Sequence, residues 1–190
     1  MIDIRYFIDR QNGAREAAPA LPTPAPARDT RVVRADERTA FDLMGPSIEP
    51  LTSGKEESYS VMKGAIPPGV SVPLHSYGDA ESFYVQSGEA QLLVQKGDSL
   101  DWQTLRPGDF AQIPPDAKHA WRNVSDQPME ALIITTPRLG RVLREVGGPV
   151  SGCERLSFRP GSMQRWREVN ARYGYWIASP EENAAFGISL

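Results

Sequence analysis

The residues best suited to chemistry are the chain's only two histidines, His75 and His119, and a glutamate, Glu81, that lies six positions after the first. Two neutral imidazoles and one carboxylate can occupy one face of an octahedron around a divalent metal ion. The remaining positions are then open to O₂, water or a substrate. Such ligands suit Fe, Mn, Ni, Co or Zn and do not select among them. The alternative is three polar side chains that fall in a β-rich region without forming a site.

The surrounding sequence predicts short strands. Between residues 31 and 137, candidate strands are punctuated by Gly, Pro and Asp, and the chain holds 17 prolines and 16 glycines, which favour turns over long helices. Many short strands at close spacing indicate a sandwich or barrel. The candidates are RVVRA (31–35), YSVMKGAI (59–66), SFYVQSG (82–88), AQLLVQKG (90–97), FAQIP (110–114) and EALIITTP (130–137).

The ends of the chain differ from this β region. Residues 1–10 alternate apolar and polar positions and predict a strand or arm, and the Ala/Pro-rich segment 13–29 predicts an extended linker. After Pro137 the spacing changes to that of helices. One helix is predicted over 139–146, stopped by Gly147, and a second from Ser162 as its N-cap. A third begins at Ser179, with a proline and acidic residues in its first turn.

Composition excludes several classes of protein. The 190 residues carry a net charge of -3, which gives no reason to expect nucleic acid or an anionic membrane as a partner. A single cysteine, Cys153, permits no disulfide within the chain. The N-terminus lacks the continuous apolar run of a signal peptide, and no segment approaches the ~20 apolar residues of a membrane span. We therefore expect a cytoplasmic protein.

Fixed spacings connect the three candidate ligands to two longer patterns. The first has the form G-x5-H-x-Y-x3-E-x6-G, and the second, 19 residues later, the form G-x5-P-x-D-x2-H-x3-N. These resemble the two motifs of the cupin superfamily, which usually carry a second histidine in the first motif and a second glycine in the other. The positions are Gly69, His75, Tyr77, Glu81, Gly88, Gly108, Pro114, Asp116, His119 and Asn123.

The resemblance implies an all-β fold, a double-stranded β-helix or jelly-roll barrel with an N-terminal arm and C-terminal helices. It divides the chain into an arm and linker (1–30), a cupin barrel (31–137) and a helical extension packed on the barrel (138–190). The segments VLREVGGPVSG and ARYGYWI also resemble the ending of single-domain bacterial cupins of the quercetin-dioxygenase-like kind. Inward-facing residues of neighbouring strands converge in a small barrel, so His75, Glu81 and His119 would meet as metal ligands.

Tyr77 stands where the second motif histidine is usual. A phenol with a pKa near ~10 is a weak ligand, so Tyr77 either donates a hydrogen bond to a metal-bound water or substrate, as a catalytic residue alongside Glu81, or is an aromatic at the barrel mouth. Strand parity places Phe83 with Glu81 and Trp121 with His119. Phe83, Trp121 and Tyr77 are therefore the predicted substrate-binding residues.

The remaining inward positions are open to two interpretations. Ala90, Leu92 and Val94 share one face of their strand, opposite Gln91 and Gln95, and either add to an apolar cavity or pack in the core. We expect core packing for Leu92 and Val94. Asn123 is expected at a turn or strand end, and the aromatic tail residues, Tyr173, Tyr175 and Trp176, are expected to dock a helix onto the barrel.

Two classes of function fit these predictions. One is a metal-dependent enzyme, an oxygenase acting on a small aromatic or secondary-metabolite-like compound, with an isomerase or lyase as the nearest variant. The other is a non-catalytic binder of small molecules, since one fold hosts many functions. The edge strands of such a sandwich need cover, so a homodimer is expected, with the 1–10 arm as one way to supply it.

Overall fold

The computed structural model describes residues 29–53, 58–149 and 161–189. By contacts the chain divides into two units, Met1–Val32 and Val33–Leu190, and every helix and strand below lies in the second. The predicted N-terminal strand, nearly all of the linker, and Cys153 lie outside the described residues.

Twelve strands lie in the described part of the second unit. Their order confirms the β-rich prediction, and they carry each candidate ligand on a strand. The strands are β1 (Phe41–Asp42), β2 (Ser47–Pro50), β3 (Ser60–Ile66), β4 (Ser71–Ser76), β5 (Glu81–Ser87), β6 (Ala90–Lys96), β7 (Ser99–Leu105), β8 (Phe110–Ile113), β9 (His119–Arg122), β10 (Met129–Thr135), β11 (Gly148–Pro149) and β12 (Trp176–Ile177).

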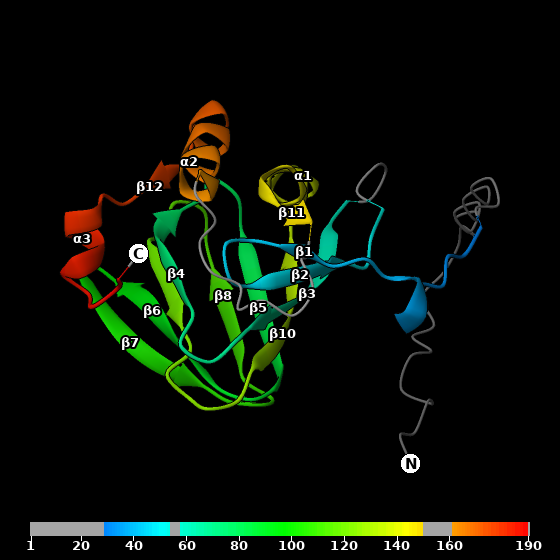
Figure 1. Ribbon diagram of the computed structural model, residues 1–190, viewed down its shortest axis with the longest axis horizontal. Helices are drawn as coiled ribbons and strands as arrows, with labels where there is room; N and C mark the ends of the chain where they lie inside the picture. The colour runs from blue at the N-terminus through cyan, green and yellow to red at the C-terminus, as the bar shows by residue number, and fades with distance from the viewer. Residues whose placement is uncertain (1–28, 54–57, 150–160, 190) are drawn as a thin grey trace, which may run out of the picture. The chain divides into compact units, whose positions relative to one another are not determined.

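The strands form two antiparallel sheets (Figure 1). One runs in the order β11-β1-β2-β3-β10-β5-β8 and the other in the order β12-β4-β9-β6-β7. Consecutive strands such as β4 and β5 therefore alternate between the sheets. This is the predicted jelly roll, or double-stranded β-helix, with C-terminal helices. Because it places the inner faces of both sheets around one interior, residues from both can share a site.

Burial along the strands alternates with the period of two that the sequence predicted. In β5, Glu81, Phe83 and Val85 are buried, whereas Tyr84 is exposed. In β10, Met129, Ala131 and Ile133 are buried on one parity. A period of two with one face covered is what a sandwich strand requires.

Among the described residues, three α-helices follow β10, with β11 and β12 between them. They are α1 (Pro137–Val146), α2 (Ser162–Arg172) and α3 (Pro180–Ala184). Figure 1 shows α1 and α2 side by side at one end of the sheets, and α3 beside β4. Helix α1 buries its predicted apolar stripe and ends at Val146, with Gly147 as its C-cap, and α3 has the predicted Ser179 cap, completed by Glu182.

Two local predictions are wrong. Residues 31–35 form no strand, and the last of them, Ala35, begins a short 3₁₀ helix, η2 (Ala35–Glu37). Val32 is 69% exposed, so the apolar residues of this segment are not buried against another element, as those of a strand would be. Ser162 is the first residue of α2 rather than its cap. The cap is Gly161, with φ +88°, and no side chain caps the helix.

None of the helices among the described residues is long and apolar enough to cross a membrane.

Candidate metal centre

The three candidate ligands come from three strands in two sheets. His75 lies in β4 and His119 begins β9, and these two residues face each other in the register of the pair. Glu81 begins β5 in the opposite sheet, next to Ile113 of β8. The crossing of the chain from β4 to β5 therefore places the carboxylate opposite the two imidazoles, across the interior.

The ligand atoms converge. One atom from each of His75, Glu81 and His119 lies within 4.8 Å of the others. The Oε2 atom of Glu81 is 3.3 Å from Nε2 of His119, and the centroids of the two imidazole rings are 4.1 Å apart. All three residues are at most 4% exposed. This group could hold a metal ion.

Backbone hydrogen bonds orient both imidazoles. His75 Nδ1 lies 2.7 Å from the carbonyl oxygen of Pro73, and His119 Nδ1 lies 3.1 Å from that of Ala117. A carbonyl can only accept, so each Nδ1 donates its proton to the backbone, which leaves Nε2 as the ring nitrogen that can bind a metal. Metal-ligating histidines usually have such a partner on the other ring nitrogen.

The resulting charge arrangement favours a cation. His119 Nε2 is buried without a hydrogen-bond partner among the described residues, yet it faces the Glu81 carboxylate at 3.3 Å. A lone pair and a carboxylate oxygen at this distance repel each other unless a cation or a proton lies between them. Burial, followed by the neighbouring His119, lowers the pKa of His75 well below its usual value, which keeps that imidazole neutral. These residues fit a divalent metal ion.

Tyr77 is buried beside the ligands rather than exposed at a rim. It is 5% exposed, and its ring centroid lies 4.6 Å from that of His75 and 6.0 Å from that of His119. Burial, and then the negative charge of Glu81, raise the pKa of its phenol well above the usual value. Tyr77 therefore stays protonated and can donate a hydrogen bond.

Asp116, the other departure from the motif, occupies the conformation that explains why glycine is usual there. Its φ is +65°, in the left-handed region that glycine adopts freely and that aspartate tolerates better than most residues. Its backbone N–H donates to the Tyr77 carbonyl at 2.7 Å. The substitution thus preserves the turn that joins β8 to β9, and with it the position of His119.

A cavity of about 80 Å³ adjoins the candidate ligands. The predicted substrate-binding residues, Phe83 and Trp121, line it together with Tyr77, and the first two rings pack edge to face with centroids 4.9 Å apart. Leu92 and Val94 do not reach this cavity. They line a separate cleft of about 390 Å³ between β6, β7 and β8, which shares only His119 with the first.

Several cavity residues were not predicted from the sequence. Trp166 of α2 is 3% exposed, and its ring centroid lies 5.7 Å from that of His75. Its helical spacing indicated a face packed on the barrel, but nothing local could show which end of the barrel that face covers. Other such residues come from β2, β3, β10, α1 and the turn after β1, and include Met44, Ile48, Ile66, Met129, Ile133 and Leu143.

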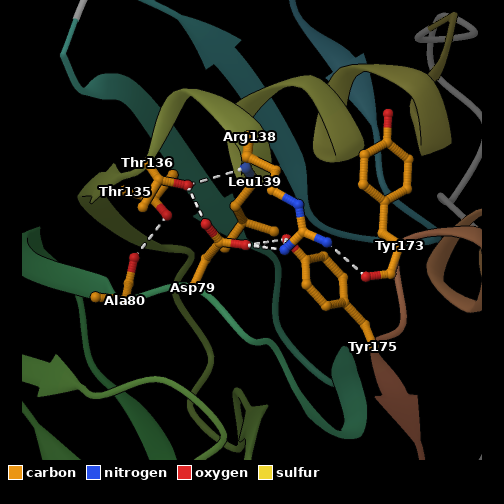
Figure 2. Close-up of polar contacts among 8 residues, drawn as sticks. All are labelled: Asp79, Ala80, Thr135, Thr136, Arg138, Leu139, Tyr173 and Tyr175. Carbon is orange, nitrogen blue, oxygen red and sulfur yellow. Dashed lines mark hydrogen bonds and ion pairs between the residues drawn. The ribbon is translucent and has the colours of Figure 1, made fainter.

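A polar network next to the site joins the loop between β4 and β5 to the helices (Figure 2). The Asp79 carboxylate accepts hydrogen bonds from Thr136 Oγ1 at 2.6 Å, from Arg138 at 2.8 Å and from the Tyr175 hydroxyl. Thr136 also caps α1 by accepting from the backbone of Leu139 at 3.1 Å. The Tyr175 ring lies 4.9 Å from that of Tyr77, so the network reaches the site through one aromatic contact.

Burial and hydrogen bonding act oppositely on Asp79. Burial raises the pKa of its carboxyl, but the hydrogen bonds from Thr136, Tyr175 and Arg138 outweigh it, and the net pKa lies below the usual value. Asp79 is therefore an anion at neutral pH, and burial followed by the bond to Asp79 raises the pKa of Tyr175.

Asn123 lies at a strand end, as expected. It follows β9 directly and is 1% exposed, and its amide donates to the carbonyls of Ile66 and Gln127 at 2.8 Å each. It therefore closes the strand end on the side away from the ligands.

Comparison with known proteins gives one family and a broad set of structures. Residues 62–135 match a family model described as Cupin domain. No match was found among curated proteins.

Solved structures similar to this chain include the following three. One is described as crystal structures of the DMSP lyases RdDddP and RnDddQII, with 22% identity, 48% of this chain and 47% of that chain covered, and a TM-score of 0.43. A conserved protein with a double-stranded β-helix domain from Klebsiella pneumoniae has 21% identity, 57% and 91% coverage, and a TM-score of 0.47. A variant of oxalate decarboxylase from Bacillus subtilis has 17% identity, 53% and 28% coverage, and a TM-score of 0.47. This chain thus spans under half of the DMSP lyase chain.

Proposed function

Sequence match and fold together support the cupin superfamily for residues 62–135, and on that premise we propose that the chain is a metal-dependent enzyme. His75, Glu81 and His119 hold one divalent transition metal, and the reaction is an oxygenation of a small molecule. The observation that carries the proposal is the unpartnered His119 Nε2, buried 3.3 Å from the Glu81 carboxylate. The quercetin-dioxygenase-like ending of the sequence supports an oxygenase rather than another cupin activity.

The roles of the side chains follow from their places. The metal, when bound, supplies Lewis acidity and open coordination positions. Glu81 is both ligand and catalytic residue, since its carboxylate faces the cavity and can accept a proton from a bound molecule. Tyr77, held protonated by burial, donates a hydrogen bond to an oxygen of that molecule. Phe83 and Trp166 exclude water from the same space.

The metal is tested first. Full-length protein purified without a His tag should contain close to one transition metal per chain by elemental analysis, and His119→Ala and Glu81→Gln should remove it. Glu89→Gln is the matched control, because Glu89 pairs with Arg106 on the surface and should leave the metal content unchanged. If the protein holds no stoichiometric metal after anaerobic reconstitution, the enzyme proposal is wrong, and a non-catalytic binder of small molecules is the alternative.

The reaction class is tested with the loaded protein. An oxygenase consumes O₂ with its substrate when iron is bound and does not do so when zinc is bound. If turnover continues with zinc bound and without O₂, the reaction is not an oxygenation, and an isomerase or lyase reaction at the same residues becomes the proposal.

A further inference from the structure

A second cleft lies where the two sheets end. Strand β8 is the last strand of one sheet and β7 the last of the other, and no strand among the described residues joins them. The cleft between β6, β7 and β8 has a volume of about 390 Å³. Small-molecule sites typically measure about 300–1,000 Å³. Since it shares only His119 with the cavity beside the candidate ligands, it can hold a molecule of its own.

The floor of this cleft is apolar and incompletely covered. Leu92, Leu105 and Ile113 are buried there, whereas Val94 and Ala111 are only half-buried. Val94 has the inward parity of Leu92 on β6, so its uncovered surface faces the space between the sheets. Partly exposed apolar surface in a concave site indicates a ligand with an apolar body.

The charge of the cleft is opposite to that of the chain. The chain carries a net charge of -3, yet two lysines, Lys96 and Lys118, and one aspartate, Asp109, are the acidic and basic side chains that line the cleft. Two of these three groups have partners. The Asp109 carboxylate accepts a hydrogen bond from the backbone N–H of Arg106 at 2.7 Å, and the Lys118 ammonium lies 4.4 Å from the centroid of the Trp176 ring.

Lys96 is the charged group of the cleft that lacks a partner. It is the last residue of β6, on the inward parity of Leu92 and Val94, and it forms no ion pair among the described residues. The aspartates of the same hairpin, Asp98 and Asp101, are not among the residues that line the cleft. An ammonium group next to an apolar floor is complementary to a carboxylate on an apolar body.

We propose that this cleft binds a small organic monocarboxylate, whose carboxylate pairs with the Lys96 ammonium and whose apolar body lies against Val94, Leu105 and Ala111. One unpaired cation balances one negative charge, so a monoanion fits better than a dianion such as a phosphate ester. The site is separate from the proposed metal centre, and its ligand is not the proposed substrate.

The experiment compares three probes that share a six-carbon chain and differ in the head group: hexanoate, hexan-1-ol and hexylammonium. Full-length protein with ¹³C-labelled Leu, Val and Ile methyl groups is titrated with each, and resonances are assigned by single substitutions to a smaller residue. Hexanoate should shift the methyl resonances of Val94 and Ile113, while those of Ile48 and Ile133 in the other cavity should stay in place. Hexanoate should bind about fivefold more tightly than hexan-1-ol, the upper range for a partly exposed ion pair, and hexylammonium should bind most weakly.

Three variants separate the charge from the apolar contact. Lys96→Gln, at an exposed position, should reduce the hexanoate-to-hexanol affinity ratio to about one and leave hexanol binding unchanged. Lys63→Gln is the matched control, because Lys63 pairs with Glu130 away from the cleft, and it should keep the ratio. Gln103→Trp fills the cleft from an exposed position that lines it, and it should weaken hexanoate and hexan-1-ol alike.

Several results would overturn the inference. They are hexylammonium binding as tightly as hexanoate, an unchanged affinity ratio in Lys96→Gln, and methyl shifts that are absent or confined to Ile48 and Ile133. Neither His75 nor Glu81 lines the cleft, so loss of this ligand would leave the proposed metal function standing, and loss of the metal would leave this ligand.

Discussion

The Asp79 network should show measurable coupling between the loop before β5 and the segment after α2. Asp79 accepts from Thr136, Arg138 and Tyr175, and hydrogen bonds to a charged group contribute roughly 1.5–3 kcal/mol each. The Arg138 side chain is 44% exposed, so its ion pair is screened and contributes at most about 1 kcal/mol. Taking the lower end for the other two bonds, Asp79→Ala should lower the free energy of unfolding by about 4 kcal/mol.

A double-mutant cycle tests this sum. Tyr175→Phe removes only the hydroxyl and should cost about 1.5 kcal/mol, and the double variant should cost about 1.5 kcal/mol less than the sum of the single changes. Tyr173→Phe is the control, because its hydroxyl lies 3.3 Å from Glu145 instead, and it should add to Asp79→Ala without coupling. The assay is guanidinium denaturation followed by tryptophan fluorescence. Additivity of Asp79→Ala and Tyr175→Phe within 0.3–0.5 kcal/mol would refute the network as a stabilising unit.

The pH dependence of the same variant has a defined sign. The pKa of Asp79 is lower in the folded chain than in the unfolded chain, so its contribution is fully present above the unfolded value of about 3.9. The contribution is lost as the pH falls through the folded pKa. The stability difference between wild type and Asp79→Ala should therefore be constant near neutral pH and shrink below about pH 4.

Two further predictions concern the motif positions. Gly88 has φ +66°, and a Cβ there would lie 2.2 Å from the Pro128 carbonyl oxygen, so Gly88→Ala should cost roughly 3 kcal/mol or more in urea unfolding. Gly97→Ala, at φ +59° with open space, should cost only about 1–2 kcal/mol, and equal losses would contradict the close approach. Tyr77→His adds an imidazole beside His75 and should tighten metal binding about tenfold in a chelator competition, whereas Tyr77→Phe should leave it unchanged. If neither variant alters metal affinity or turnover, Tyr77 is only a packing residue.

The sequence predicted best those features that depend on local period and fixed spacing. Phe83 and Val85 are buried as their parity with Glu81 required, and the motif positions His75 and His119 fall on two paired strands of one sheet, β4 and β9. These predictions are correct because side chains alternate along a strand with a period of two, and because the motif positions fall on strands of the fold that the resemblance implied.

The residues that the sequence did not place correctly are buried by segments that are distant in the chain. Leu93 shares its face of β6 with Gln91 and Gln95, which suggests solvent, yet it is fully buried. Ala178 and Ile188 pack in the same cluster and cover it. Trp166 was missed as a cavity residue for a similar reason, since its helix reaches the site from about 90 positions beyond His75. Local periodicity shows that a face is apolar but not what lies against it.

The placement of β12 makes the order of synthesis matter for the metal site. His75 lies in β4, whose outer edge is completed by Trp176 and Ile177, and the Leu74 backbone is held by Ala178 and by the Asn183 side chain at 2.8 Å. A nascent chain that ends before these residues therefore exposes an unpaired edge beside a ligand strand, open to pairing with other chains. Such long-range contacts also slow folding. The ribosome must release the chain through Ile177 before the ligand strand has both of its neighbours, so a stop after Asn123 and before Trp176 spares every motif residue and still leaves the site unfinished.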